Sequence, residues 1–424
     1  MMLGRLSQIA TFYGKRNTVG WRDGCAAPAV HESVEADYRK IRTGVALSDG
    51  SYFGHFRLAG PDALRLIDRI SLADPRRLTP DHLLPAYVLH EDGRLFFEML
   101  VGHCGDGYRL ISEGVEPMRA GAWLDALAAR WGFEVAVIDE TQSQSFIGLH
   151  GPYAWELLKE LAGPGVVGLR PLEGLAGNQL DGILFALYRV DKAGEYGYLL
   201  QLDSGYLLAL WQQLLAVGQR FDIRPAGYEA LDLCTLESRL INIHREGRLA
   251  RHALELNARV LVRRDGGDYL GRRAIERALA EGVKRRLIGM VLEEPRETRP
   301  PLEEGDGVYA EGVRVGELAR LSFSFALRRW LALAFLEADY AYAGLSYRLG
   351  GRRGDWAAQT VSAPFAVGES LRVRPRQDSY FDRNERGRTD GGERMTDPSK
   401  AAGARAQRFQ GVVADRRAYR RTIA

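Results

Sequence analysis

Apolar and polar residues follow two periods along the first 280 residues of the chain. A two-residue alternation bounded by turn residues predicts strands, and a spacing of three to four residues predicts helices. Strand patterns lie at Phe53–Leu58, Ala86–His90 and Leu95–Val101. Helical patterns lie at Pro61–Ser71, Pro117–Trp131, Tyr153–Leu161, Tyr206–Phe221 and Gly227–Leu240. Because the two kinds of element mix without strict strand–helix–strand alternation, the expected class is α+β.

The pattern changes after Lys284, where short strand patterns follow one another with few helices between them. They lie at Arg286–Leu292, Val308–Ala310, Val313–Glu317, Leu331–Leu336, Ser346–Leu349 and Gln359–Ser362. This spacing predicts a separate C-terminal β barrel or sandwich of about 85 residues, a usual domain size.

A chain of 424 residues is too long for one hydrophobic core, so two or three domains are expected. The changes of pattern place them at residues 1–283, with two intertwined α+β subdomains, and at residues 284–368, with the barrel. Residues 369–424 form a tail with few large apolar residues, which predicts disorder. This tail is either an electrostatic arm or dispensable, and the segment near Met395 also fits read-through from a neighbouring frame.

Charge is distributed unevenly along the chain. From Arg372 to the end there are 14 basic and 7 acidic residues, which leaves 44 basic and 48 acidic residues in the remainder. A core with a net charge of −4 excludes a basic nucleic-acid-binding domain. No run of apolar residues reaches the length of a membrane span or a signal peptide, so a cytoplasmic protein without membrane contact is expected.

The remaining composition excludes several kinds of site. The three cysteines, Cys25, Cys104 and Cys234, are far apart and lack a C-x-x-C spacing, so neither a disulfide framework nor a metal site is expected. The chain also lacks a glycine-rich dinucleotide motif and a phosphate-binding loop with its lysine.

Six segments, in order, resemble motifs of the aminomethyltransferase (glycine cleavage T-protein) family. They are Ala46–Gly54, Gly93–Val101, Gly148–Ala154, Ala193–Tyr198, Gly227–Glu237 and Asp268–Ala274. Each segment alone is a common turn or helix pattern, whereas six in the family's order are specific. The resemblance covers residues 20–366. It implies a ring of three domains, with mixed α/β N-terminal domains and a C-terminal β barrel, around a central channel that binds tetrahydrofolate.

By this resemblance, Glu195 matches the family's pterin-binding glutamate in a G-E-x-G turn. A carboxylate there would accept hydrogen bonds from the N–H groups of a reduced pterin. The alternative is a solvent-exposed turn residue. Tyr188, Tyr196 and Tyr198 are candidate walls of the folate site, although aromatic residues beside a strand often serve only for packing.

Two residues are candidates for proton transfer. The family's Asp-Asp pair reads Phe97-Glu98 here, so Glu98 is the candidate acid or base, with a pKa raised by its apolar neighbour. Strand alternation leaves open that Glu98 faces outward. His90, in place of the asparagine of the family's M-L-N motif, is a candidate proton carrier or an ordinary surface histidine.

Other family positions are substituted. Tyr87 lies two residues beyond Pro85, which replaces the family's tyrosine, and shares its strand face. Ser112 replaces the asparagine of an Asn-Ala pair that contacts ligand. The arginines expected to bind the glutamate tail of folate are absent from their helix, where Arg239, one turn further on, is the candidate substitute.

The sequence thus predicts a tetrahydrofolate-dependent transferase or demethylase that takes a methyl or aminomethyl group from a small methylated molecule. One alternative is a non-catalytic folate-binding accessory protein, although Asp268–Arg273 lacks the cysteine that marks that branch of the family. Another is glycine-cleavage aminomethyltransferase itself, which would act with a carrier protein. A homologue that keeps only the fold is the third.

Overall fold

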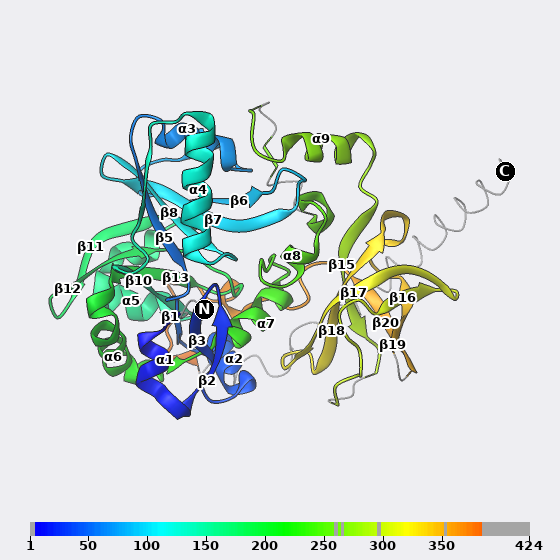
Figure 1. Ribbon diagram of the computed structural model, residues 1–424. Coiled ribbons are helices and arrows are strands. Elements are labelled where there is room, and N and C mark those ends of the chain that lie inside the picture. The colour runs from blue at the N-terminus through cyan, green and yellow to red at the C-terminus, as the bar shows by residue number, and fades with distance from the viewer. Residues whose placement is uncertain (1–4, 258–261, 264–266, 295–297, 352–353, 384–424) are drawn as a thin grey trace.

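The computed structural model describes residues 5–257, 262–263, 267–294, 298–351 and 354–383. Near the N-terminus, three short strands form a sheet in the order β1-β3-β2. These strands and the two helices beside them are β1 (Arg5–Leu6), β2 (Thr18–Arg22), β3 (Cys25–Val30), α1 (Gln8–Tyr13) and α2 (Val34–Thr43). Figure 1 shows this unit beneath two larger sheets, with the barrel to one side.

The first subdomain is a five-stranded antiparallel sheet covered on one face by two helices. Its order is β6-β7-β8-β5-β9. The elements are β5 (Gly54–Ala59), β6 (Leu84–Leu89), β7 (Leu95–Cys104), β8 (Gly107–Glu113), β9 (Ala136–Asp139), α3 (Ala63–Ile70) and α4 (Pro117–Trp131). Phe56, Phe97 and Leu124 are completely buried between the sheet and these helices. Because Phe97 points into this core, its neighbour Glu98 faces the other side of the sheet.

The second subdomain is a six-stranded sheet in the order β11-β12-β13-β10-β4-β14. Its elements are β4 (Ala46–Asp49), β10 (Gln144–His150), β11 (Gly174–Leu180), β12 (Ile183–Tyr188), β13 (Gly197–Asp203), β14 (Arg224–Pro225), α5 (Ala154–Ala162) and α6 (Leu207–Val217). The large side chains of Trp155, Trp211 and Phe221 fill its core. Strand β4 comes from the segment that precedes the first subdomain, so the two N-terminal subdomains are intertwined in sequence.

Helix α7 (Tyr228–Ser238) lies between the N-terminal subdomains and the barrel, and most of its residues are buried. Its acidic side chains are therefore paired inside the protein. Glu237 accepts hydrogen bonds from Tyr38 at 2.7 Å and Arg42 at 2.8 Å. After α7, helices α8 (Glu246–Leu249) and α9 (Arg272–Ala280) lead to the barrel.

The C-terminal domain is a closed six-stranded barrel in the order β15-β18-β17-β16-β19-β20. Its strands are β15 (Arg285–Leu292), β16 (Gly307–Ala310), β17 (Val313–Ser324), β18 (Arg329–Glu337), β19 (Ser346–Gly351) and β20 (Gly354–Val361). Met290, Val308 and Leu349 are fully buried in its core. Pairing of β15 with β20 closes the sheet, so of the two architectures allowed by the sequence it is the barrel that forms.

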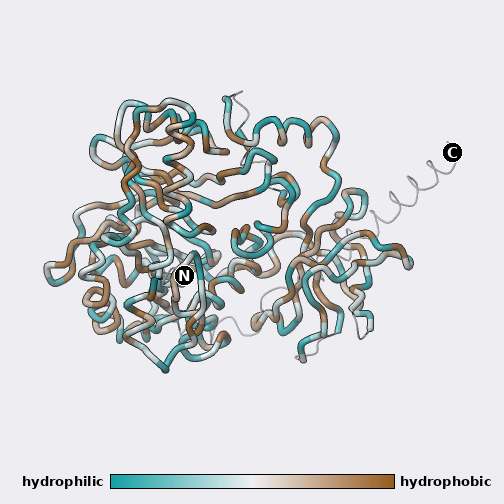
Figure 2. The backbone as a smooth tube through the Cα atoms, in the orientation of Figure 1, coloured by the Kyte–Doolittle hydropathy of each residue, from teal (hydrophilic) through white to brown (hydrophobic). Residues whose placement is uncertain are grey.

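The expected α+β class is confirmed, and helix α4 has the predicted bounds. Figure 2 shows apolar and polar stretches alternating through both N-terminal subdomains and the barrel. Within the described part of the chain, every helix is too short or too polar to cross a membrane.

The C-terminal segment corrects one prediction. Residues 369–383 were expected to belong to a disordered tail, but they pack along the second subdomain, beginning with the short helix η9 (Glu369–Leu371). Val373 and Tyr380 are buried in its core. Ser379 and the backbone N–H of Tyr380 both donate to Glu156 at 2.6 Å. The low apolar content of the whole tail predicted disorder, because an average over many residues does not reveal a few specific contacts. The rest of the predicted tail lies outside the described residues.

Candidate functional site

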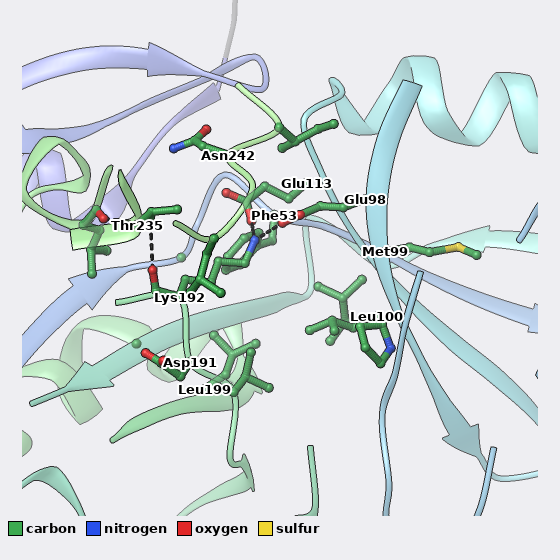
Figure 3. Close-up of a pocket in the computed structure, with 18 of the residues that line it drawn as sticks. Phe53, Glu98, Met99, Leu100, Glu113, Asp191, Lys192, Leu199, Thr235 and Asn242 are labelled. Carbon is green, nitrogen blue, oxygen red and sulfur yellow. Dashed lines mark hydrogen bonds and ion pairs between the residues drawn. The ribbon is translucent and has the colours of Figure 1, made fainter. Parts of the chain in front are cut away.

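A cavity of about 330 Å³ lies where the two N-terminal sheets meet helix α7. Its walls come from β4, β6, β7, β8, β10, β13, the turn before β13, and the loop after α7. Figure 3 shows part of this wall. Among the described residues of the barrel strands, none lines the cavity, so the two intertwined subdomains enclose it without the third domain.

Three polar side chains form a row across the first sheet. Strand register places Tyr87 of β6 opposite Glu98 of β7, and Glu98 opposite Glu113 of β8. Directly opposed residues share one face of a sheet with their side chains close together. All three line the cavity.

Lys192 joins this row from the second subdomain. Its Nζ pairs with a carboxylate oxygen of Glu98 and with one of Glu113, as the dashed lines in Figure 3 show. The turn that carries Lys192 is fixed from both sides. Asp191 accepts hydrogen bonds from two backbone N–H groups of the turn at 2.7 and 2.8 Å, and Thr235 of α7 donates to the carbonyl of Lys192 at 2.7 Å.

Lys192 lines the cavity and is the most exposed member of this cluster. Its side chain keeps 38% of its surface exposed, whereas the carboxylates of Glu98 and Glu113 keep 16% and 6%. Burial and the nearby Arg22 guanidinium lower the pKa of Lys192 to about 7, so both the charged and the neutral amine are populated near neutral pH.

A second layer of charges supports the first. Arg22 bridges Glu113 at 3.2 Å and Asp232 at 3.0 Å. His244 lies 3.0 Å from Glu113 through Nε2. Although burial opposes ionisation of Asp232, Arg22 and neighbouring arginines hold its pKa well below the usual value. These pairs hold the two carboxylates in place and keep Asp232 ionised.

The opposite wall is less polar. His150 of β10 contacts the hydroxyl of Ser48 through Nε2 at 2.8 Å, and burial lowers the pKa of His150 to about 4, so its ring is neutral at pH 7. Phe53, Tyr198 and Leu199 add apolar surface. A flat ligand would therefore lie against apolar walls, with ionisable groups at one edge.

No group of three or more His, Cys, Asp or Glu side chains in the described ranges could hold a metal ion. The chemistry available from the side chains of the cavity is proton transfer, charge stabilisation and attack by an amine.

Of the candidate residues from the sequence, Glu98, Tyr87 and Tyr198 line this cavity. Strand alternation in the sequence left open which face of the sheet Glu98 lies on. Because Phe97 is buried in the core on one face, Glu98 lies on the other face, toward the cavity.

The expectation that Glu195 lines the cavity is corrected. Its side chain is completely shielded. One carboxylate oxygen accepts from Arg42 at 3.0 Å, and the other accepts from the backbone N–H of Ser370 at 2.8 Å and from its hydroxyl at 2.6 Å. The C-terminal segment thus covers the carboxylate, which leaves no free acceptor for a ligand.

Ser112 and His90 also lie elsewhere. Ser112 precedes Glu113 on β8 and therefore points to the opposite face, where it is fully buried. His90 lies in the turn between β6 and β7, where its ring packs on Phe96 at a centroid distance of 4.5 Å. Neither side chain contributes to the lining of the cavity.

The three remaining candidates have structural contacts. Tyr188 accepts a hydrogen bond from Arg109, and the hydroxyl of Tyr196 donates to the carbonyl of Val373 at 3.2 Å. Arg239 follows α7 and lies over the ring of Phe365, 5.1 Å from its centroid. None of the three is among the residues that line the cavity, and their roles in folate binding stay predictions.

Sequence reasoning missed Lys192 and Glu113 as a pair of site residues. Lys192 directly precedes the Ala193–Tyr198 motif. Its position in this glycine-rich turn is the sequence feature that could have identified it as a site residue. Glu113 follows Ser112 directly. Choosing between these two neighbours requires the facing of β8, which follows from its register with β7 and not from the local pattern.

The fold and the cavity together define an α+β protein with a C-terminal β barrel and a cavity of small-molecule size between its N-terminal subdomains. Two family models match most of the chain: "GCVT N-terminal domain" over residues 7–266 and "Glycine cleavage T-protein C-terminal barrel domain" over residues 285–366. The chain belongs to the glycine cleavage T-protein family of aminomethyltransferases, which use tetrahydrofolate, and it is a divergent member.

Aminomethyltransferases of other organisms are similar to most of this chain. An aminomethyltransferase of Moorella thermoacetica is 27% identical over 343 residues, covering 81% of this chain and 92% of its own. One of Symbiobacterium thermophilum is 29% identical over 349 residues, with the same coverage. The glycine cleavage system aminomethyltransferase T of Bartonella henselae has a similar fold, with a TM-score of 0.74 at 20% identity, over 87% of this chain and 99% of its own.

Proposed function

We propose that this enzyme transfers a methyl or aminomethyl group from a small molecule to N5 of tetrahydrofolate bound in the cavity. The observation that carries the proposal is the position of Glu98, on the wall of the cavity and beside the amine of Lys192. The names of the relatives support transfer of a one-carbon group. The family resemblance supports tetrahydrofolate as the acceptor.

The size and walls of the cavity suit a reduced pterin. A volume of about 330 Å³ lies within the range of small-molecule sites, roughly 300–1,000 Å³. Tyr87 and Phe53 offer flat surfaces, and Glu98 and Glu113 offer acceptors for the N–H groups of the ring. The carboxylate pair takes the pterin-binding role that the sequence had assigned to Glu195.

Glu98 would also manage charge during transfer. N5 loses a proton when it gains carbon, and an amine leaving group gains one. Glu98 touches the ionisable amine of Lys192, so a proton can pass between the two groups without bulk water. A donor that carries an amine or ammonium group would pair with the same carboxylates. This charge pattern favours a methylated or aminomethylated amine as the donor.

The first test is calorimetric titration of the full-length protein with tetrahydrofolate under anaerobic conditions. The second is incubation with tetrahydrofolate and N-, S- or O-methyl donors labelled with ¹³C, followed by mass spectrometry of the folate. We expect saturable binding and a label on methyl- or methylene-tetrahydrofolate. Absence of folate binding would overturn the proposal.

The same assay separates the alternatives. Transfer only from an aminomethylated lipoyl carrier protein would identify the glycine-cleavage reaction. Folate binding without transfer from any of these donors would indicate a folate-binding accessory protein.

A further inference from the structure

Lys192 is the lysine whose amine faces the cavity. The chain has six lysines, of which Lys400 lies outside the described residues. Lys15 and Lys159 are exposed on the surface, Lys40 pairs with Asp222, and Lys284 donates to a backbone carbonyl. Among the lysines of the described residues, Lys192 alone lines this cavity.

The surroundings of Lys192 meet the requirements of an imine-forming site. Such a site needs an amine that can lose its proton, an adjacent acid or base to remove water from the adduct, and partial exclusion of solvent. Glu98 and Glu113 contact the amine directly. The ring of Phe53 lies 5.9 Å from Nζ and shields one side. The side chain of Lys192 is one of those that line the cavity (Figure 3).

A purely structural role as counter-ion explains less of this arrangement. Glu113 already has Arg22 and His244 as cationic or donor partners. A counter-ion would also keep its charge, whereas burial and Arg22 lower the pKa of Lys192 to about 7. An amine that is partly neutral at pH 7 is a poor permanent counter-ion and a competent nucleophile.

We propose that Lys192 takes up a one-carbon unit at the oxidation level of an aldehyde as a covalent iminium and passes it to tetrahydrofolate. This inference rests on the proposed function. It selects the aldehyde-level carbon of an aminomethyl donor over a methyl group, and it extends the donors to formaldehyde, the simplest carbonyl compound at that level. No oxidant or reductant is required, because the carbon stays at the same oxidation level throughout.

The bonds balance in two stages. The lone pair of Nζ attacks the carbonyl carbon, forming a C–N bond while the C=O π bond becomes a hydroxyl group. Glu98 protonates that hydroxyl, and water leaves to give the iminium. N5 of tetrahydrofolate then attacks the iminium carbon, and N10 displaces the amine of Lys192. The protons lost by N5 and N10 return to Glu98 and the amine, so aldehyde and tetrahydrofolate give methylene-tetrahydrofolate and water.

The central experiment is reductive trapping on the wild-type protein without folate. Full-length protein is treated with ¹³C-formaldehyde and cyanoborohydride between pH 6 and 9, then digested and analysed by mass spectrometry. At pH 7 we expect Lys192 to gain a labelled methyl group at least about tenfold faster than an ordinary surface lysine, because much more of its amine is neutral. The trapping rate should rise with pH around a midpoint near 7.

Two variants complete the test. Lys192→Arg keeps a cation between the two glutamates but cannot form an iminium, so transfer from formaldehyde above the uncatalysed background should disappear while folate still binds. Lys159→Arg is the matched surface control and should leave both properties unchanged. Labelling of Lys192 no faster than Lys159, or wild-type transfer by Lys192→Arg, would overturn the inference.

The outcomes also separate this inference from the proposed function, because trapping does not require folate. If folate binds and accepts a methyl group while Lys192 stays unlabelled, the covalent step is wrong and the proposed function survives. If Lys192 is trapped rapidly but folate does not bind, the amine is an aldehyde-reactive group and the proposed function is wrong.

Discussion

Glu98 and Glu113 lie directly opposite each other on strands β7 and β8, and both contact the amine of Lys192. Two carboxylates side by side repel each other, and the hydrogen-bond donor between them relieves that repulsion. The lysine comes from another sheet, 94 residues from Glu98 and 79 from Glu113 in the sequence. The contact therefore joins the two subdomains, and its strength depends on the charges of Glu98, Glu113 and Lys192.

Replacing Glu98 with glutamine should impair chemistry more than binding. The change preserves shape but removes the acid–base group and one partner of Lys192. We expect kcat to fall at least about 100-fold, the lower range for a general acid–base residue, with the dissociation constant for tetrahydrofolate changed by less than tenfold. His90→Gln, remote from the cavity lining, is the control and should retain wild-type values. Equal losses in both variants would contradict the role assigned to Glu98.

Replacing Glu195 with glutamine should lower stability and leave folate affinity intact. The carboxylate is shielded and holds both Arg42 and Ser370. Loss of its charge should lower the free energy of unfolding by about 2–4 kcal/mol, as for other buried pairs, measured by denaturant titration. The exposed Glu369→Gln is the control, with little expected effect. A stable Glu195→Gln protein that no longer binds folate would return this residue to the site.

Shortening the C-terminal segment should have a position-dependent effect. A chain that ends after Arg383 keeps the contacts of Val373 and Tyr380 with the second subdomain, whereas one that ends after Leu371 loses them. Burial of two such side chains contributes about 3 kcal/mol or more. We expect thermal unfolding at a lower temperature for the shorter chain only. Equal melting temperatures would show that the segment is dispensable.

Acidic pH should destabilise the protein through His150. Its pKa in the folded state, about 4, lies below the ordinary value of 6.5 because the ring is buried. Between pH 6.5 and 4 the unfolded chain therefore binds a proton that the folded chain does not, and the free energy of unfolding falls as the pH is lowered.

His150→Gln tests that contribution. Denaturant titrations across this pH range should show proton uptake on unfolding reduced by about one proton relative to wild type. The exposed His103→Gln is the control and should leave the slope unchanged. An unchanged slope in His150→Gln would mean that this ring is already protonated in the folded protein.

The sequence by itself determined the elements and the kind of fold. The six barrel strands and helix α4 follow from local patterns of apolar residues, because burial of one face imposes a period on the chain. The motifs likewise determined the family. Resemblance to the family's motifs also identified Glu98 and Tyr87 as candidate site residues.

The tertiary structure alone decided which polar residues share the cavity. Glu195 is turned away because Ser370, 175 residues further along the chain, satisfies its carboxylate, and no local pattern contains that contact. Lys192 enters the site because a turn of one sheet meets the open face of another. Strand register, which places Glu113 and not Ser112 beside Glu98, depends on pairing between distant segments. The chemistry of each side chain is known from the sequence, but which side chains contact one another depends on packing between segments that are far apart in the chain.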